Sequence, residues 1–430
     1  VNDQKLIEAV RSGAMAESVL DQIVTRYLTI VFEAVEKGKG EAFDQDSHHY
    51  LARRVAAESI VLLKNTEKLL PLELGTFDSL AVIGSMAEDP RFQGAGSSEV
   101  TPTRLDIPLE EIKRAVGSKV RVAYQPGYSD VGEEPDPGLL SAAVKSAGEC
   151  DIAVVFAGLP SEMESEGYDR PHMDMPKTHI KLIKAVAAVQ PRTVVVLSNG
   201  APVAVGDWLD QVPAVLESWL SGQGGGRAVA DILFGRVNPS GKLPETFPIC
   251  LSDNPSFLNF AGENGRVLYG EGLYVGYRYY DKKNVEPLFP FGYGLSYTTF
   301  KYGSLECSRE QMKDTESVQV SCAIENTGTR AGKETVQLYV QPGRSRLDRP
   351  KKELKAFTKV ELAPGETKSV TFTLSFRDFA YYDPLQGEWV VDSGTYTVLV
   401  GSSSRDIHLE KDVYIESSQG PLPLTKDSSL

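Results

Sequence analysis

The chain has 430 residues, more than one compact domain commonly holds, so we expect two or three domains. Its 45 basic and 59 acidic side chains give a net charge of −14, which argues against nucleic acid as a partner because such binding depends on Lys and Arg facing phosphates. No apolar run approaches the ~20 residues that span a bilayer, so no membrane partner is expected. The four cysteines are too scattered for a zinc ribbon or a dense disulfide framework.

Residues 1–44 predict two helices. Apolar side chains recur at helical spacing in DQKLIEAVR and again in ESVLDQIVTRYLTIVFEAVEK, and a glycine follows each within two residues. Two helices without a strand cannot enclose a core of their own. Their apolar stripe therefore predicts a partner surface.

Residues 45–250 alternate helix and strand, which is typical of an α/β domain with a parallel sheet. Ligands bind such sheets at the carboxyl ends of the strands, so the loops that follow the strands are the candidate site. We expect helices over 48–65, 107–116, 138–150 and 178–190, and strands over 79–85, 119–127, 151–158 and 193–200.

The composition and the apolar–polar pattern change twice over the rest of the chain. Residues 251–300 are rich in Pro, Gly and Tyr and are expected to link two domains. Residues 301–416 alternate apolar and polar side chains between turn residues, which predicts an all-β sandwich. Residues 417–430 have no periodic pattern and are expected to form a tail.

The loop after the 151–158 strand gathers acidic side chains at a place where a ligand is expected. From residue types alone a solvated acidic loop is the favoured interpretation, and metal binding or general acid/base chemistry stay open beside it. The five histidines form no H-x-x-x-H pair, which disfavours zinc or iron. The charged residues of this loop are Glu162, Glu164, Glu166, Asp169, Arg170, His172 and Asp174.

Several segments together resemble glycoside hydrolase family 3, the β-glucosidase-like enzymes. They are LARRVAAESIVLLKN, AVIGS…GAGSSEVTP, ESEGYDR…MDMP, SWLSGQGGGRAVADILFGRVNPSGKLPETFP and PLFPFGYGLSYTTF, in the family's order. The resemblance implies an (α/β)6 sandwich domain at 45–250 and a fibronectin type III-like domain at 301–416. It also identifies residues 1–44 as the last helices of a (β/α)8 barrel and the linker after it.

The resemblance implies a role for individual residues as well. The family's general acid/base is a glutamate in an E-G-x-D-R-like context, which is Glu166 here, with Glu164 as the local rival. Phe92, Ser97, Tyr168 and Arg170 are the candidate sugar-binding residues. No cofactor and no metal are implied.

The implied reaction is retaining glycoside hydrolysis by two carboxylates. In the family the nucleophile is an aspartate on the barrel, which needs roughly 250 residues, whereas only 44 precede the sandwich domain here. We therefore expect a barrel polypeptide as partner, as the other piece of a nicked enzyme or as a separate chain, while a truncated chain is the third explanation. A homodimer and a cytoplasmic location are also expected.

The expected function is the acid/base part of a retaining exo-acting β-glycosidase, most simply a β-glucosidase, that acts on terminal non-reducing β-D-glycosyl residues of a β-glucoside or related oligosaccharide. Glucose, xylose and galactose stay open as the sugar in the pocket. The alternative is a non-catalytic module that binds carbohydrate or scaffolds other subunits.

Overall fold

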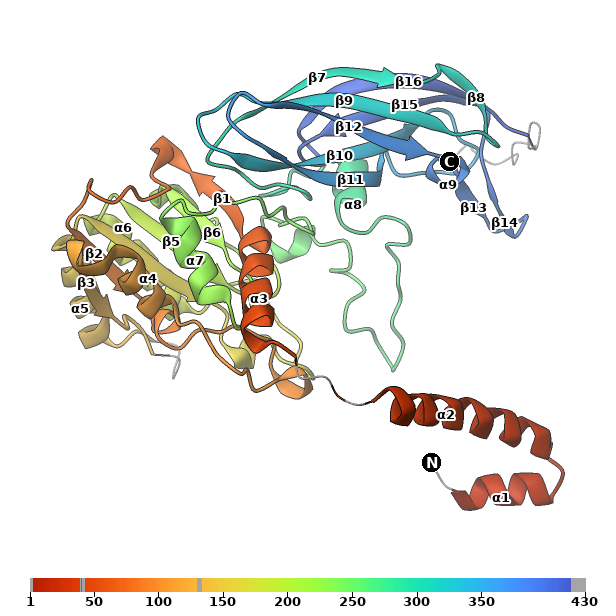
Figure 1. Ribbon diagram of the computed structural model, residues 1–430, viewed down its shortest axis with the longest axis horizontal. Coiled ribbons are helices and arrows are strands. Elements are labelled where there is room, and N and C mark those ends of the chain that lie inside the picture. Colours follow the sequence, from red (N-terminus) through yellow and green to blue (C-terminus); the bar gives the residue numbers. More distant parts are fainter. Residues whose placement is uncertain (1–2, 39, 41–42, 130–133, 419–430) are drawn as a thin grey trace. The chain divides into compact units, whose positions relative to one another are not determined.

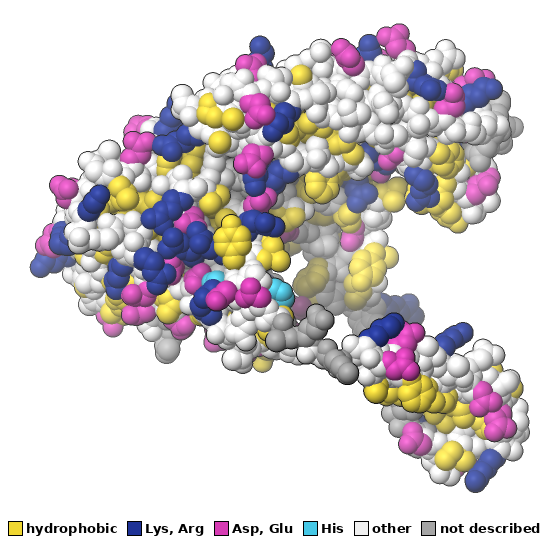
Figure 2. Space-filling model, viewed as in Figure 1, with side chains coloured by type: hydrophobic (Ala, Val, Ile, Leu, Met, Phe, Trp, Pro, Cys, Tyr) yellow, Lys and Arg dark blue, Asp and Glu magenta, His cyan; other side chains and the backbone are white. Residues whose placement is uncertain are grey.

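The computed structural model describes residues 3–38, 40, 43–129 and 134–418, and it divides into the units 1–48 and 49–430. The first unit contains helices α1 (Asp3–Arg11) and α2 (Glu17–Lys37), as Figure 1 shows. Neither helix has a buried residue, so their apolar stripe is not enclosed within this unit. Figure 2 shows these apolar side chains in yellow along the two helices.

The second unit begins with a three-layer α/β domain. Its six-stranded sheet has the order β1-β6-β5-β4-β2-β3, in which β1 is antiparallel to β6 and all other pairs are parallel. The strands are β1 (Val61–Asn65), β2 (Ser79–Ile83), β3 (Arg121–Gln125), β4 (Ile152–Gly158), β5 (Thr193–Ser198) and β6 (Ala214–Glu217). The helices are α3 (Gln45–Ser59), α4 (Pro108–Val116), α5 (Pro137–Gly148), α6 (Lys177–Val189) and α7 (Gly225–Leu233).

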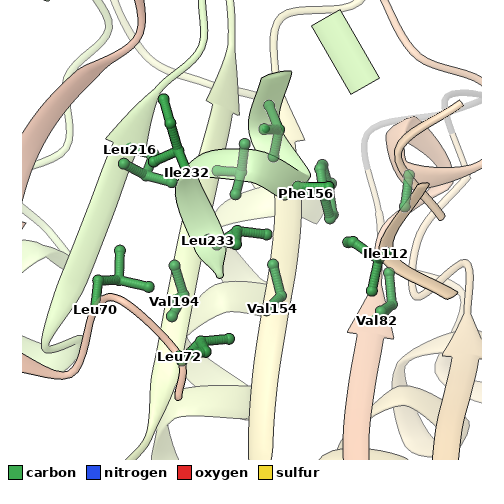
Figure 3. Close-up of a cluster of buried hydrophobic side chains, with 14 of the residues drawn as sticks. Leu70, Leu72, Val82, Ile112, Val154, Phe156, Val194, Leu216, Ile232 and Leu233 are labelled. Atoms are coloured by element: carbon green, nitrogen blue, oxygen red, sulfur yellow. The ribbon is translucent and has the colours of Figure 1, made fainter. Parts of the chain in front are cut away.

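Each face of the sheet is covered by its own set of helices. Helices α3, α4 and α7 share one apolar core with the sheet, part of which Figure 3 shows, with Val154 and Val194 on the strands facing Ile232 and Leu233 on α7. Helices α5 and α6 share the other core with the opposite face. Burial on both faces explains why these strands are almost continuously apolar.

The expected helix over 48–65 is partly wrong. Helix α3 ends at Ser59, and the apolar run that follows it forms strand β1 at the sheet edge. Residues 60–63 are all buried, because β1 pairs with β6 on one side and Leu62 bridges to Leu295 on the other. Four successive buried residues cannot lie on one stripe of a surface helix. Strand β6, only four residues long, was not expected either.

The β-sandwich has a five-stranded sheet of order β11-β10-β15-β16-β8, a three-stranded sheet of order β12-β9-β7 and a small hairpin β13-β14. Its strands are β7 (Phe300–Cys307), β8 (Gln311–Lys313), β9 (Val318–Asn326), β10 (Gly332–Pro342), β11 (Glu353–Leu362), β12 (Thr367–Leu374), β13 (Tyr381–Asp383), β14 (Glu388–Val390), β15 (Gly394–Gly401) and β16 (Ile407–Glu416), with the one-turn helix α9 (Phe376–Phe379) before β13. Alternating burial along β9, with every second residue buried, is the pattern expected for a strand that faces a core on one side.

Charged and polar side chains join the sandwich to the α/β domain. Lys333 and Lys359 both donate to Glu58 of α3, at 2.6 and 3.5 Å. The buried side chain of Gln337 donates to the carbonyl of Gly292, where a Cβ atom would lie 2.2 Å from the Gln337 amide. The linking segment, which includes α8 (Tyr277–Lys283), therefore packs on the sandwich.

Candidate active site

A cavity of about 760 Å³ opens at the carboxyl edge of the parallel sheet. Four loops contribute to it, namely those after β2, β4, β5 and β6, which is where a ligand is expected in such a sheet. The linking segment adds one aromatic ring. The lining residues are Gly94, Ala95, Ser97, Ser98, Glu164, Ser165, Glu166, Tyr168, Asp169, Arg170, Gly200, Ala201, Leu220 and Phe260.

Two of these loops run side by side and bring Glu166 to Ser97. A bridge between Ala95 and Ser165 aligns the loops. The Ser97 amide donates to Glu166 Oε2 at 3.2 Å, and the Ser97 hydroxyl donates to the same oxygen. Between them Gly96 has φ +80°, and a Cβ there would lie 3.1 Å from that of Glu166. A glycine at 96 therefore permits both the turn and the close approach.

The Glu166 carboxylate is exposed and has no cationic partner among the residues that the structure describes. The two Ser97 donors hold its pKa below the usual value for glutamate. A general acid needs the opposite shift, which burial or a second carboxylate would supply. The carboxylate is thus at the cavity, but in this chain it is charged near neutral pH.

Glu164, the rival, is placed quite differently. Its carboxylate accepts from Arg91 Nη1 at 2.7 Å and from the Gly200 amide at 2.8 Å. The side chains of Arg91 and Glu164 are only 6% and 17% exposed. This enclosed ion pair holds the loop to the loop after β2, and the Gly200 amide holds it to the turn after β5. Glu164 is therefore suited to fix the loop, whereas Glu166 is free to exchange a proton.

Of the other predicted sugar-binding residues, two line the cavity and one does not. Tyr168, which is 73% exposed, and Arg170 both line the cavity. Arg170 Nη1 donates to the carbonyl of Pro202 at 3.2 Å, while its Nε and Nη2 are buried and have no hydrogen-bond partner among the residues that the structure describes. Phe92 is not among the lining residues. Its carbonyl instead accepts from the Gly222 amide at 2.8 Å, which ties the loop after β2 to the loop after β6.

A buried carboxyl group lies close to this site and was not expected from the sequence. Glu217, the last residue of β6, is 0% exposed, and its Oε1 and Oε2 accept from the Trp219 amide and from Asn199 Nδ2, both at 2.9 Å. Burial raises the pKa of Glu217 to about 8, and the nearby carboxylates of Glu164 and Glu245 contribute to that rise. No pattern in the sequence separates this glutamate from the exposed ones.

The glycines before α7 have a packing role. A Cβ at Gly224 would lie 2.6 Å from the backbone of Arg53 in α3, and one at Gly226 would lie 2.1 Å from the carbonyl of Asp106. The neighbours that require glycine here are therefore α3 and the start of α4. Within the described residues, no three His, Cys, Asp or Glu side chains form a group that could hold a metal ion. None of the helices in this same part of the chain has the length and apolar character to cross a membrane.

Comparison with known proteins agrees with this architecture. Residues 60–297 match the glycosyl hydrolase family 3 C-terminal domain, and residues 334–404 match the fibronectin type III-like domain. The chain belongs to glycoside hydrolase family 3. The first of these matches spans the α/β domain and the linking segment, and the second lies within the sandwich, so the expected fold class is confirmed.

Characterised relatives are similar over almost the whole chain. Thermostable β-glucosidase B of Acetivibrio thermocellus is 52% identical over 97% of this chain, and an exo-α-(1→6)-L-arabinopyranosidase of Bifidobacterium breve is 41% identical over 99%. The crystal structure of a Bifidobacterium adolescentis family 3 β-glucosidase superposes with a TM-score of 0.92 at 41% identity, covering 99% of this chain and 62% of that one. The chain spans only 55% and 57% of the length of the two curated relatives.

Proposed function

We propose that this chain supplies the general acid/base of a retaining β-glycosidase, and that a (β/α)8 barrel supplies the nucleophile. One observation carries the proposal, namely that Glu166, a carboxylate with no cationic partner in the described part of the chain, lies on the wall of a cavity at the carboxyl edge of the sheet. The relatives named β-glucosidases make terminal β-D-glucosyl residues the first substrate to test. The relative named an arabinopyranosidase makes α-L-arabinopyranosides the second.

In this reaction Glu166 protonates the leaving oxygen while the barrel aspartate attacks the anomeric carbon, which forms a glycosyl–enzyme bond and releases the aglycone. Glu166 then takes a proton from water as that water attacks the intermediate and frees the aspartate. The two carboxyl groups of a retaining enzyme lie about 5–5.5 Å apart. A second carboxylate at that distance, in a cavity closed by the barrel, would raise the pKa of Glu166 against the pull of Ser97.

Arg170 is suited to the same closed site. Its Nε and Nη2 have no partner and are buried, although Nη1 is bound to Pro202. A guanidinium in this state retains donors for a sugar hydroxyl or for a carboxylate of the partner. Tyr168 offers an exposed ring beside it for an apolar face of the sugar.

The proposal of a barrel partner rests on apolar side chains that are exposed in this chain. Helix α2 carries part of them, and a second set lies on the segment 257–275 before α8. Turns order this segment, since Glu263 and Arg266 exchange two backbone hydrogen bonds of 2.9 Å, yet its Leu258 and Tyr269 are 89% and 81% exposed. Because Phe260 of the same segment also lines the cavity, a polypeptide that covers the segment would close the site.

The test is to produce this chain together with a family 3 barrel polypeptide and to measure the native mass and the hydrolysis of aryl glycosides. We expect a complex that is active, whereas each piece alone is inactive. A chain that remains a lone monomer and binds oligosaccharide by itself would favour the non-catalytic module instead. The native mass also tests the expected homodimer, and a cytoplasmic location stays a prediction.

The role of Glu166 is tested in that complex with Glu166→Ala, with Glu162→Ala in the same loop as the matched control. General acid catalysis contributes a factor of about 10²–10⁴ to the rate, so Glu166→Ala should slow the hydrolysis of natural glycosides by that factor. A dinitrophenyl glycoside needs no proton on its leaving group and should still form the glycosyl–enzyme, which azide then releases. An equal loss with both substrates, without azide rescue, would refute the role.

A further inference from the structure

The loops after β5 and β6 meet beneath the cavity at one buried carboxyl group. Asn199, fully buried one residue after β5, donates from Nδ2 to Glu217 Oε2 and to the carbonyl of Ala201, both at 2.9 Å. The Trp219 amide donates to Glu217 Oε1 at 2.9 Å. Both oxygens of one side chain are therefore used to hold two separate turns.

These turns form part of the cavity wall. Gly200 and Ala201 follow Asn199, Leu220 follows Trp219, and all three line the cavity. Trp219 has φ +58°, a left-handed conformation that a residue with a side chain adopts only when its surroundings enforce it. The bond from its amide to Glu217 is one such constraint.

We infer that Glu217 is a positioning residue of the candidate site, whose buried carboxyl group fixes the turns after β5 and β6 and thereby the part of the cavity wall that these turns form. The catalytic meaning of this inference rests on the proposed function. A link to the acid/base loop also exists, because the Gly200 amide donates to Glu164, two residues before Glu166.

The surroundings of Glu217 favour its neutral form. The charged groups that act on it are Glu164, from the loop after β4, and Glu245, from the segment after α7, and both are carboxylates. Among the described residues, no Lys, Arg or His pairs with it. Ionisation would strengthen the two donor bonds, but it would also place a charge beside two other carboxylates in a buried site, which draws water between the turns.

The raised pKa of Glu217 sets the direction in which stability changes with pH. The folded-state pKa of Glu217, about 8, lies above the ordinary value of 4.5 for an exposed glutamate. The stability that this group contributes is therefore fully present below about 4.5 and is lost as pH rises through 8. Activity that depends on these turns should weaken over the upper part of the same range.

The chain has three tryptophans, so fluorine-labelled tryptophan should give three ¹⁹F NMR signals, and Trp219→Phe assigns one of them. We expect the Trp219 signal to titrate with a midpoint of about 8 in the unchanged chain and to stay constant in Glu217→Gln. Glu334→Gln, at another buried glutamate, is the control and should leave the titration in place. A titration that persists in Glu217→Gln, or is absent from the unchanged chain, overturns the inference.

Kinetics in the complex with the barrel give the second measurement. Glu217→Gln is neutral at every pH and keeps one acceptor oxygen for the two donors, so it should retain more of kcat/KM at pH 6 than Glu217→Ala does. Glu217→Ala frees both turns and should lower kcat by roughly tenfold to a hundredfold. Full activity of Glu217→Ala would refute the positioning role. If the unchanged complex itself fails to hydrolyse glycosides, the proposed function fails, whereas the NMR titration still decides whether Glu217 holds the turns.

Discussion

The β-sandwich and the carboxyl edge of the α/β sheet both contain buried acidic side chains, but different kinds of group bind those side chains in the two regions. In the sandwich Arg346 binds Asp383, and their side chains are 5% and 0% exposed. At the sheet edge Glu217 is equally buried and has only neutral donors. A carboxylate paired with arginine is kept in one charge state, whereas an unpaired one changes its proton within an accessible pH range. In this pair of sites, Asp383 contributes a paired charge to the sandwich, whereas Glu217 can titrate at the sheet edge.

The largest effect on stability is expected in the sandwich. Arg346→Ala leaves the Asp383 carboxylate buried without its cation, which should lower the free energy of unfolding by about 3–5 kcal/mol. Urea unfolding of the whole chain measures this. A loss below about 1 kcal/mol would mean that this buried pair stabilises the fold no more than an exposed ion pair does. The proposed difference between the sandwich and the sheet edge would then be wrong.

The next largest effect on stability should distinguish the two glutamates of the acidic loop, Glu164 and Glu166. Glu164→Ala removes the partner of the enclosed Arg91 and should lower the free energy of unfolding by about 1–3 kcal/mol. Glu166→Ala should leave the unfolding midpoint unchanged, because that side chain is exposed. If the order is reversed, Glu166 is a structural residue and Glu164 becomes the candidate acid.

A smaller effect is expected from Ser97→Ala, measured as the pH profile of kcat/KM in the complex with the barrel. Ser97 lowers the pKa of Glu166, so losing its hydroxyl should raise that pKa. Because the acid form of Glu166 must donate the proton, the alkaline limb of the profile should move to higher pH. Ser98→Ala, whose hydroxyl donates to the Ala95 carbonyl, should not move it.

The smallest effect is expected at an exposed ion pair of α4. Lys113 and Glu110 are 46% and 56% exposed and lie 2.8 Å apart. Lys113→Ala should change the free energy of unfolding by no more than about 0.5 kcal/mol, which thermal unfolding can verify. A larger change would show that exposed pairs matter here as much as the buried Arg346 pair.

The sequence predicted most of the α/β domain because buried parallel strands and amphipathic helices leave strong patterns. It failed at β1, where an apolar run follows a helix directly and periodicity cannot distinguish a strand from a continued helix. It also failed at β6, which is too short to show any period. In the sandwich, β16 alternates in burial, as the apolar and polar alternation over 301–416 predicts.

For the site, the resemblance supplied Glu166 and Ser97, and the structure places them in contact. Phe92 could not be judged from sequence, because its ring and its carbonyl serve different neighbours and only coordinates tell which one matters. Glu217 and Phe260 lie on segments with no chemical motif, so their place at or beside the cavity depends on tertiary structure alone.

The antiparallel strand β1 has a consequence for synthesis of the chain. It leaves the ribosome before every other strand of its sheet, yet its neighbour β6 is made about 150 residues later. At roughly 5–20 residues per second, β1 waits on the order of ten to thirty seconds for its place. During that interval its apolar run has no native strand partner, which makes residues 60–63 a candidate target for chaperones that bind nascent chains.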